Sequence, residues 1–133
     1  MITEDYVSFE TAKLLEEKGF DEYCPLWYHL NKPTEGPFFY KEIGWYGHNS
    51  YCYAGRNIIS APSLQMAIKW LRKVHNIHVV PKFDFYAGDY TGRIYDGRRK
   101  SAAEKDDYIA IVGNSTYEKA CEEAIKYCLK NLI

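Results

Sequence analysis

The sequence has no charge excess of either sign. Its 17 basic and 18 acidic residues give a formal net charge of -1 at pH 7. A strongly basic chain attracts nucleic acid or anionic membranes through its overall field, and this composition provides no such general attraction. A local basic cluster is still compatible with the balance, so a nucleic-acid partner must be sought in the pattern of individual residues.

Long hydrophobic segments are also missing. No apolar run approaches the ~18 residues that a membrane-spanning helix needs, and the amino-terminal residues lack the basic-then-apolar order of a secretion signal. We therefore expect a cytoplasmic protein without a membrane partner.

The four cysteines, Cys24, Cys52, Cys121 and Cys128, lack the spacing of a metal site. They form no C-x-x-C pair, which is the spacing typical of zinc ligands. Cys121 and Cys128 lie seven residues apart in one expected helix, about 10 Å along its axis and too far apart to bridge to each other. We expect four reduced thiols, no metal and no cofactor.

The central segment, Ser60–Ile77, has the clearest helical pattern in the chain. Ser60 can cap its start, and Pro62 falls in the first turn, where a missing N–H costs nothing. Apolar residues recur at about 100° per residue and define one buried face. These residues are Leu64, Ala67, Ile68, Leu71 and Val74, followed by His75.

Two further helices are expected near the ends of the chain. Phe9–Lys18 is preceded by the capping residue Ser8 and followed by Gly19, which favours the end of a helix. The last helix begins at a capping box formed by Ser115 and Glu118 and continues to the final residue.

Six strands are expected, three before and three after the central helix. The order is helix-strand-strand-strand-helix-strand-strand-strand-helix, which predicts a single α+β domain over residues 1–133, with three helices packed on an antiparallel sheet. The last strand has apolar residues on both sides, so we expect an inner strand there. The segments are Leu26–Leu30, Phe38–Ile43, Tyr51–Ala54, His78–Tyr86, Thr91–Asp96 and Tyr108–Val112.

Aromatic residues make up 17% of the chain, and 13 of them are tyrosines. Such enrichment favours strands with half-exposed faces or a recognition surface. Met66 and Trp70 lie off the buried stripe of the central helix, where they either pack beneath the aromatic segment of residues 44–55 or anchor another protein or a second copy. Trp45 and Tyr46 belong to a glycine-punctuated segment that is either a binding loop or a connection packed over the core.

A basic cluster begins in the strand expected at Thr91–Asp96 and continues into the residues that follow it. Arginine side chains bind phosphates and tyrosine rings stack on unpaired bases, so the cluster predicts contact with single-stranded nucleic acid. The alternative is a solvated loop whose charge is partly neutralised by nearby acidic residues. The cluster comprises Arg93, Arg98, Arg99 and Lys100, with Tyr90 and Tyr95 on its flanks.

No combination of residues indicates catalysis. His75 and His78 straddle the end of the central helix without a third ligand nearby in sequence. For His29 and His48, nothing fixes a nucleophile, a base and an orienting group together. We therefore rank a small non-enzymatic accessory or interaction protein first, a nucleic-acid-associated protein second and an enzyme of unknown type third.

Three stretches carry a resemblance that covers roughly half of the chain: ITEDYVSFETAKLLEEKGFDE, SAPSLQMAIKWLRKVHNI and TYEKACEEAIKYCLKNLI. They resemble a set of short uncharacterised proteins encoded by gut Bacteroides genomes and by the phages and mobile elements integrated in them. The resemblance implies a bacterial origin, a phage or mobile-element context and an intracellular location. No catalytic or binding residues are assigned to that set, so none are carried over.

Overall fold

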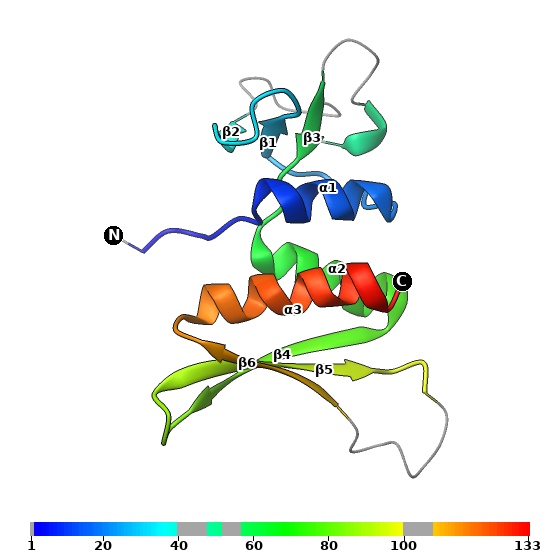
Figure 1. The fold of residues 1–133 in the computed structure, drawn as a ribbon. Coiled ribbons are helices and arrows are strands. Elements are labelled where there is room, and N and C mark those ends of the chain that lie inside the picture. Colours follow the sequence, from blue (N-terminus) through cyan, green and yellow to red (C-terminus); the bar gives the residue numbers. More distant parts are fainter. Residues whose placement is uncertain (1, 40–47, 52–56, 100–107) are drawn as a thin grey trace. The chain divides into compact units, whose positions relative to one another are not determined.

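The computed structural model describes residues 2–39, 48–51, 57–99 and 108–133. Within them, three helices and six strands follow one another in the expected order, which confirms the α+β fold. The chain divides into two compact units, Met1–Ser63 (unit 1) and Leu64–Ile133 (unit 2) (Figure 1). The two strand groups form two separate antiparallel sheets of three strands each. The single domain over residues 1–133 stays a prediction.

Unit 1 combines helix α1 (Phe9–Glu17) with a sheet in the order β2-β1-β3. The central strand of this sheet is β1 (Leu26–His29). It pairs antiparallel with β2 (Phe38–Phe39) on one side and with β3 (Ile58–Ser60) on the other. A short 3-10 turn, η2 (Asn49–Tyr51), precedes β3 in the chain.

One side chain of η2 ties this turn to two distant parts of unit 1. The amide nitrogen Nδ2 of Asn49 donates a hydrogen bond to the carbonyl oxygen of Phe20 at 2.7 Å. Its oxygen Oδ1 accepts a hydrogen bond from the backbone N–H of Ser60 at 2.9 Å. Asp21 reinforces the connection, because its Oδ1 accepts from the backbone N–H of Ser50 at 2.7 Å. These three side-chain hydrogen bonds connect the turn to Phe20, Asp21 and Ser60.

Unit 2 contains two helices and a sheet in the order β4-β5-β6. Both helices lie on the same face of this sheet (Figure 1). The strands form an antiparallel meander in which β5 is central. The elements are α2 (Leu64–His75), β4 (Ile77–Asp84), β5 (Asp89–Asp96), β6 (Ile109–Asn114) and α3 (Tyr117–Asn131).

The core of unit 2 lies between the helices and this sheet. Ile77, Val79 and Ile94 alternate along their strands with exposed or half-buried residues and are buried on the helix side. Gly92, also buried, marks a close approach between β5 and α3. A Cβ atom at Gly92 would lie 2.9 Å from the carbonyl oxygen of Ala120, so only a residue without a side chain fits there without a shift.

Local signals predicted the first helix well and misplaced the start of the central one. The Ser8 hydroxyl caps α1 as expected, and Gly19 follows the helix with a φ of 92°. The central helix α2, in contrast, begins at Leu64, because Ser60 belongs to β3 and pairs there with Trp27. The apparent capping residue is thus used in a sheet.

Three other expectations need correction. The N-cap of α3 is Thr116, whose hydroxyl accepts a hydrogen bond from a backbone N–H at 3.1 Å, and the predicted capping box at Ser115 lies one residue too early. Tyr51 belongs to η2, while the rest of the strand expected at Tyr51–Ala54 falls outside the described residues. In the sheet of unit 2, β6 lies at the edge, so its apolar pattern did not indicate an inner position.

Three of the four cysteines lie in the described residues, and all three are buried free thiols. Burial raises the pKa of Cys24 and of Cys128 to about 12 and that of Cys121 to about 11. The neutral thiol is therefore the form present near pH 7. Cys52 lies outside the described residues.

In the described part of the chain, no helix is both long enough and apolar enough to cross a bilayer.

Candidate functional site

The face of the β4-β5-β6 sheet opposite the helices, here called the outer face, carries polar and aromatic side chains. Side chains alternate between the two faces of a strand. Because Val79 and Ile94 point to the helices, Lys82 of β4 and Arg93 of β5 point to the outer face. Tyr108, just before β6, is 42% exposed. The unit thus has one covered face and one face accessible to a ligand.

Strand register arranges the outer-face residues in three rows. Arg93 lies opposite Val80 and Ala110, and Lys82 lies opposite Thr91, so neither cation has a carboxylate beside it in its row. Arg93 and Lys82 are diagonal neighbours, for which a separation of about 7–8 Å is typical. The first row contains His78 and Tyr95, with Tyr108 beside them. The second row contains Val80, Arg93 and Ala110, and the third contains Lys82 and Thr91.

Arg93 is oriented by an aromatic ring. Its guanidinium carbon lies 4.5 Å from the ring centroid of Tyr108, a cation-π contact. The Tyr108 ring in turn lies 5.5 Å from that of Tyr95. Contact with a ring face uses no N–H donor, so Arg93 keeps the donor groups that bind a phosphate or carboxylate.

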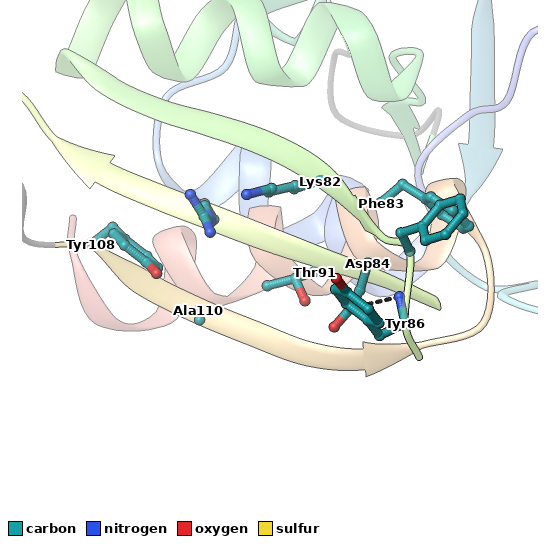
Figure 2. A pocket seen from close by; sticks show the side chains of 9 residues that line it. Lys82, Phe83, Asp84, Tyr86, Thr91, Tyr108 and Ala110 are labelled. Atoms are coloured by element: carbon teal, nitrogen blue, oxygen red, sulfur yellow. Dashed lines mark hydrogen bonds between the residues drawn. The ribbon is translucent and has the colours of Figure 1, made fainter. Parts of the chain in front are cut away.

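An open hollow of about 460 Å³ lies in the outer face (Figure 2). This volume is within the range of about 300–1,000 Å³ that is typical of ligand sites. Tyr108 lies at one end of the hollow and Tyr86 at the other, with Lys82 and Thr91 between them (Figure 2). The remaining lining residues are Phe83, Asp84, Phe85, Arg93 and Ala110.

The turn between β4 and β5 presents two rings to solvent. Phe85 is 84% exposed and Tyr86 is 100% exposed. The carboxylate oxygen Oδ1 of Asp84 accepts hydrogen bonds from the backbone N–H groups of Tyr86 at 3.0 Å and Ala87 at 3.1 Å. Both rings were expected in a strand, but β4 ends at Asp84 and this Asp turn places them at the tip of the hairpin.

The structure places only part of the predicted basic cluster on the outer face. Arg93 and Tyr95 lie there, beside Tyr108. Tyr90 points to the helix side, where its ring lies 5.9 Å from a tyrosine of α3. Arg99 is exposed beyond the end of β5, and Lys100 lies outside the described residues.

Arg98 is engaged with the end of α3. Its Nε and Nη2 atoms donate to the two carboxylate oxygens of Asp96 at 2.8 and 2.9 Å. Nη2 also donates to the carbonyl oxygen of Leu132 at 3.0 Å, which satisfies a carbonyl at the end of the helix. The hydrogen bonds from Arg98 lower the pKa of Asp96. We assign Arg98 a structural role.

The residues predicted for a protein interface do not form one exposed surface in the described residues. Trp70 is only 5% exposed, and its ring lies edge-on to that of His75 with centroids 4.8 Å apart. Met66 is half-buried. A buried indole cannot anchor a partner without opening the core. The predicted packing of Trp70 beneath residues 44–55 falls mostly outside the described residues. Trp45 and Tyr46 lie outside the described residues.

Of the residues that line the hollow, the sequence predicted only Arg93 as a contact, and the missed residues include Lys82, Tyr86 and Tyr108. The alternation of side chains between the two faces of a strand gave part of the information needed to find them, because it puts Lys82 and Arg93 on the polar sides of their strands. Bringing them together requires the register between β4 and β5, because the two residues lie eleven positions apart in the sequence. In the described ranges, no three His, Cys, Asp or Glu side chains gather as a metal site.

Comparison with known proteins does not assign this arrangement to a family. No family model, curated protein or solved structure matches the chain. The resemblance to Bacteroides and phage proteins stays a prediction. A functional hypothesis must therefore rest on the outer face itself.

Proposed function

We propose that this protein is a non-enzymatic binding protein that holds nucleic acid on the outer face of the β4-β5-β6 sheet. The observation that supports the proposal is the position of Lys82 and Arg93 as diagonal neighbours beside exposed tyrosine rings. Lysine attracts phosphate as a compact charge, and arginine can bind two phosphate oxygens with its fork of N–H groups. A chain with almost no net charge can bind a polyanion through such a local patch.

The proposal reverses the order in which the sequence ranked the two binding functions. The accessory protein that binds another protein had a predicted interface of four residues. Trp70 is buried and Met66 is half-buried, while Trp45 and Tyr46 lie outside the described residues. The nucleic-acid hypothesis keeps two of its predicted residues on an accessible face, Arg93 and Tyr95, and gains Lys82 and Tyr108. A phage or mobile-element origin and a cytoplasmic location remain part of the proposal.

Fluorescence anisotropy with labelled DNA and RNA oligonucleotides tests the proposal. We expect binding that weakens with salt and is reduced in Lys82→Ala, in Arg93→Ala and most in the double variant. For single strands, each lost phosphate contact should lower the slope of log affinity against log salt by about 0.7. Lys69→Ala removes a charge from the exposed side of α2 and serves as the matched control.

Two results would refute the proposal. One is the absence of binding to DNA and RNA even at low salt, where electrostatic attraction is strongest. The other is a double variant that binds with the affinity and salt slope of Lys69→Ala. Circular dichroism and thermal unfolding of each variant show that the fold is retained before affinities are compared.

A further inference from the structure

We infer that the nucleic acid bound in the hollow is single-stranded and that unpaired bases stack on Tyr86 and Tyr108. This inference rests on the proposed function and names the class of nucleic acid that the site accepts. It is supported by the exposure of the hairpin tip, by the distribution of charge along the hollow and by the shape of the alternative ligand, a duplex.

The exposure of Tyr86 has no explanation in the packing of unit 2. Tyr86 is 100% exposed and contributes nothing to the core, although its ring lies edge-on to that of Phe85 with centroids 6.2 Å apart. The backbone that carries it is nevertheless held by the two hydrogen bonds to Asp84, so the ring projects from a fixed turn. A ring presented in this way is a platform for a flat, apolar partner, and every nucleobase has such a face.

Charge changes along the hollow in a way that separates phosphates from bases. Lys82 and Arg93 attract phosphates to its middle. The carboxylate of Asp84 lies beside Tyr86 at the hairpin end, where it repels a phosphate and tolerates a neutral base. Tyr108, at the other end, is already stacked with the Arg93 guanidinium, and a base can extend that stack.

A duplex cannot use this arrangement. Its bases are stacked on one another inside the helix, so the ring of Tyr86 would meet only backbone and groove edges. It would keep the two phosphate contacts of Lys82 and Arg93, which alone provide weak binding. Along β5, the outer face measures about 20 Å from Tyr95 to Asp89, at ~3.4 Å per residue. A short single strand can lie along this length.

The test compares three labelled probes of equal length: a single strand of DNA, the same strand with abasic sites in place of its bases, and a blunt duplex. The wild-type protein should bind the base-bearing single strand roughly tenfold or more tightly than the abasic strand, because stacking on aromatic rings is sequence-tolerant and substantial. Tyr86→Ala should remove most of that preference, and Tyr86→Phe should keep it. Tyr23→Ala is the matched control, since Tyr23 is 42% exposed and lies in unit 1.

The outcomes separate this inference from the proposed function. If the three probes bind equally and Tyr86→Ala changes nothing, while the double variant of Lys82 and Arg93 still weakens all three, the inference is wrong and the nucleic-acid function stands. If none of these probes binds, and an RNA single strand of the same length does not bind either, both are wrong. Because Tyr86 is fully exposed, its substitution leaves the fold intact, which keeps the comparison interpretable.

Discussion

Gly92 is a position where a single added methyl group should destabilise unit 2 through the backbone of a helix. A Cβ atom there would lie 2.9 Å from both the carbonyl oxygen of Ala120 and the Cβ of Ala124. The first of these atoms belongs to the backbone of α3, so it cannot move away by a change of rotamer. In Gly92→Ala, either α3 must shift from the sheet or the strand must bend.

The size of the effect follows from two opposing terms. Where an alanine fits without strain, replacing glycine stabilises a protein by ~0.4–1 kcal/mol, because the unfolded chain loses freedom. Extra atoms forced into a packed core cost about 1–3 kcal/mol. We therefore expect Gly92→Ala to lower the free energy of unfolding by about 1–2 kcal/mol. With an unfolding entropy of ~2.1 cal/mol/K per residue, this corresponds to a fall in Tm of roughly 4–7 °C for a chain of 133 residues.

Thermal and urea unfolding followed by circular dichroism measure this change. Gly92→Val should be less stable again, since two more methyl groups meet the same helix. Ala110→Val adds bulk to the exposed side of the adjacent strand and should leave stability nearly unchanged. A Gly92→Ala protein as stable as the wild type, or more stable, would show that α3 does not pack on β5 as closely as the structure indicates.

Two further predictions concern charged groups at the other end of the sheet. Burial, together with the positive charge of Arg98, lowers the pKa of His75 below its value of 6.5 in the unfolded chain. The unfolded chain then binds more protons than the folded one, so the free energy of unfolding falls as the pH drops through 6.5. In urea titrations, His75→Phe should flatten this fall between about pH 7 and pH 5. An unchanged pH dependence of the variant would exclude His75 as the source of the fall. Arg98→Lys keeps the charge but loses the paired hydrogen bonds to Asp96. Because the Arg98 side chain is 43% exposed, we expect the free energy of unfolding in urea to fall by only about 0.5–1.5 kcal/mol. Nucleic-acid affinity should not change in that variant, and a loss there would contradict the structural role assigned to Arg98.

The secondary structure could be predicted where its signals are local. Ser8 and Gly19 bound α1 correctly, because a cap is a contact between residues three or four positions apart. Ser60 and Pro62 looked equally convincing as the start of the central helix. The structure uses Ser60 in β3 instead, through pairing with a strand more than thirty residues earlier. The helix-start signals of one short segment cannot show that a distant strand pairs with the same residues.

The candidate site was predictable only in part, for a similar reason. Arg93 and Tyr95 stand close together in the sequence and carry the expected chemistry. Lys82 and Tyr108 join them only because antiparallel register brings three strands together. Tyr86 depends on the position of a turn, which shifted by a few residues from its expected place. Sequence pattern alone also does not show which face of the sheet the helices cover, and this decides which residues are accessible.

The two hydrogen bonds of Asn49 make unit 1 sensitive to a chemical change that leaves the shape of the side chain almost untouched. Slow hydrolysis of an asparagine amide yields aspartate, which has two acceptor oxygens and no N–H donor. Such deamidation at Asn49 would keep the acceptor for Ser60 but set a charged oxygen against the carbonyl of Phe20. A preparation of this protein would then age into two populations of nearly equal mass, one with this connection intact and one with it broken.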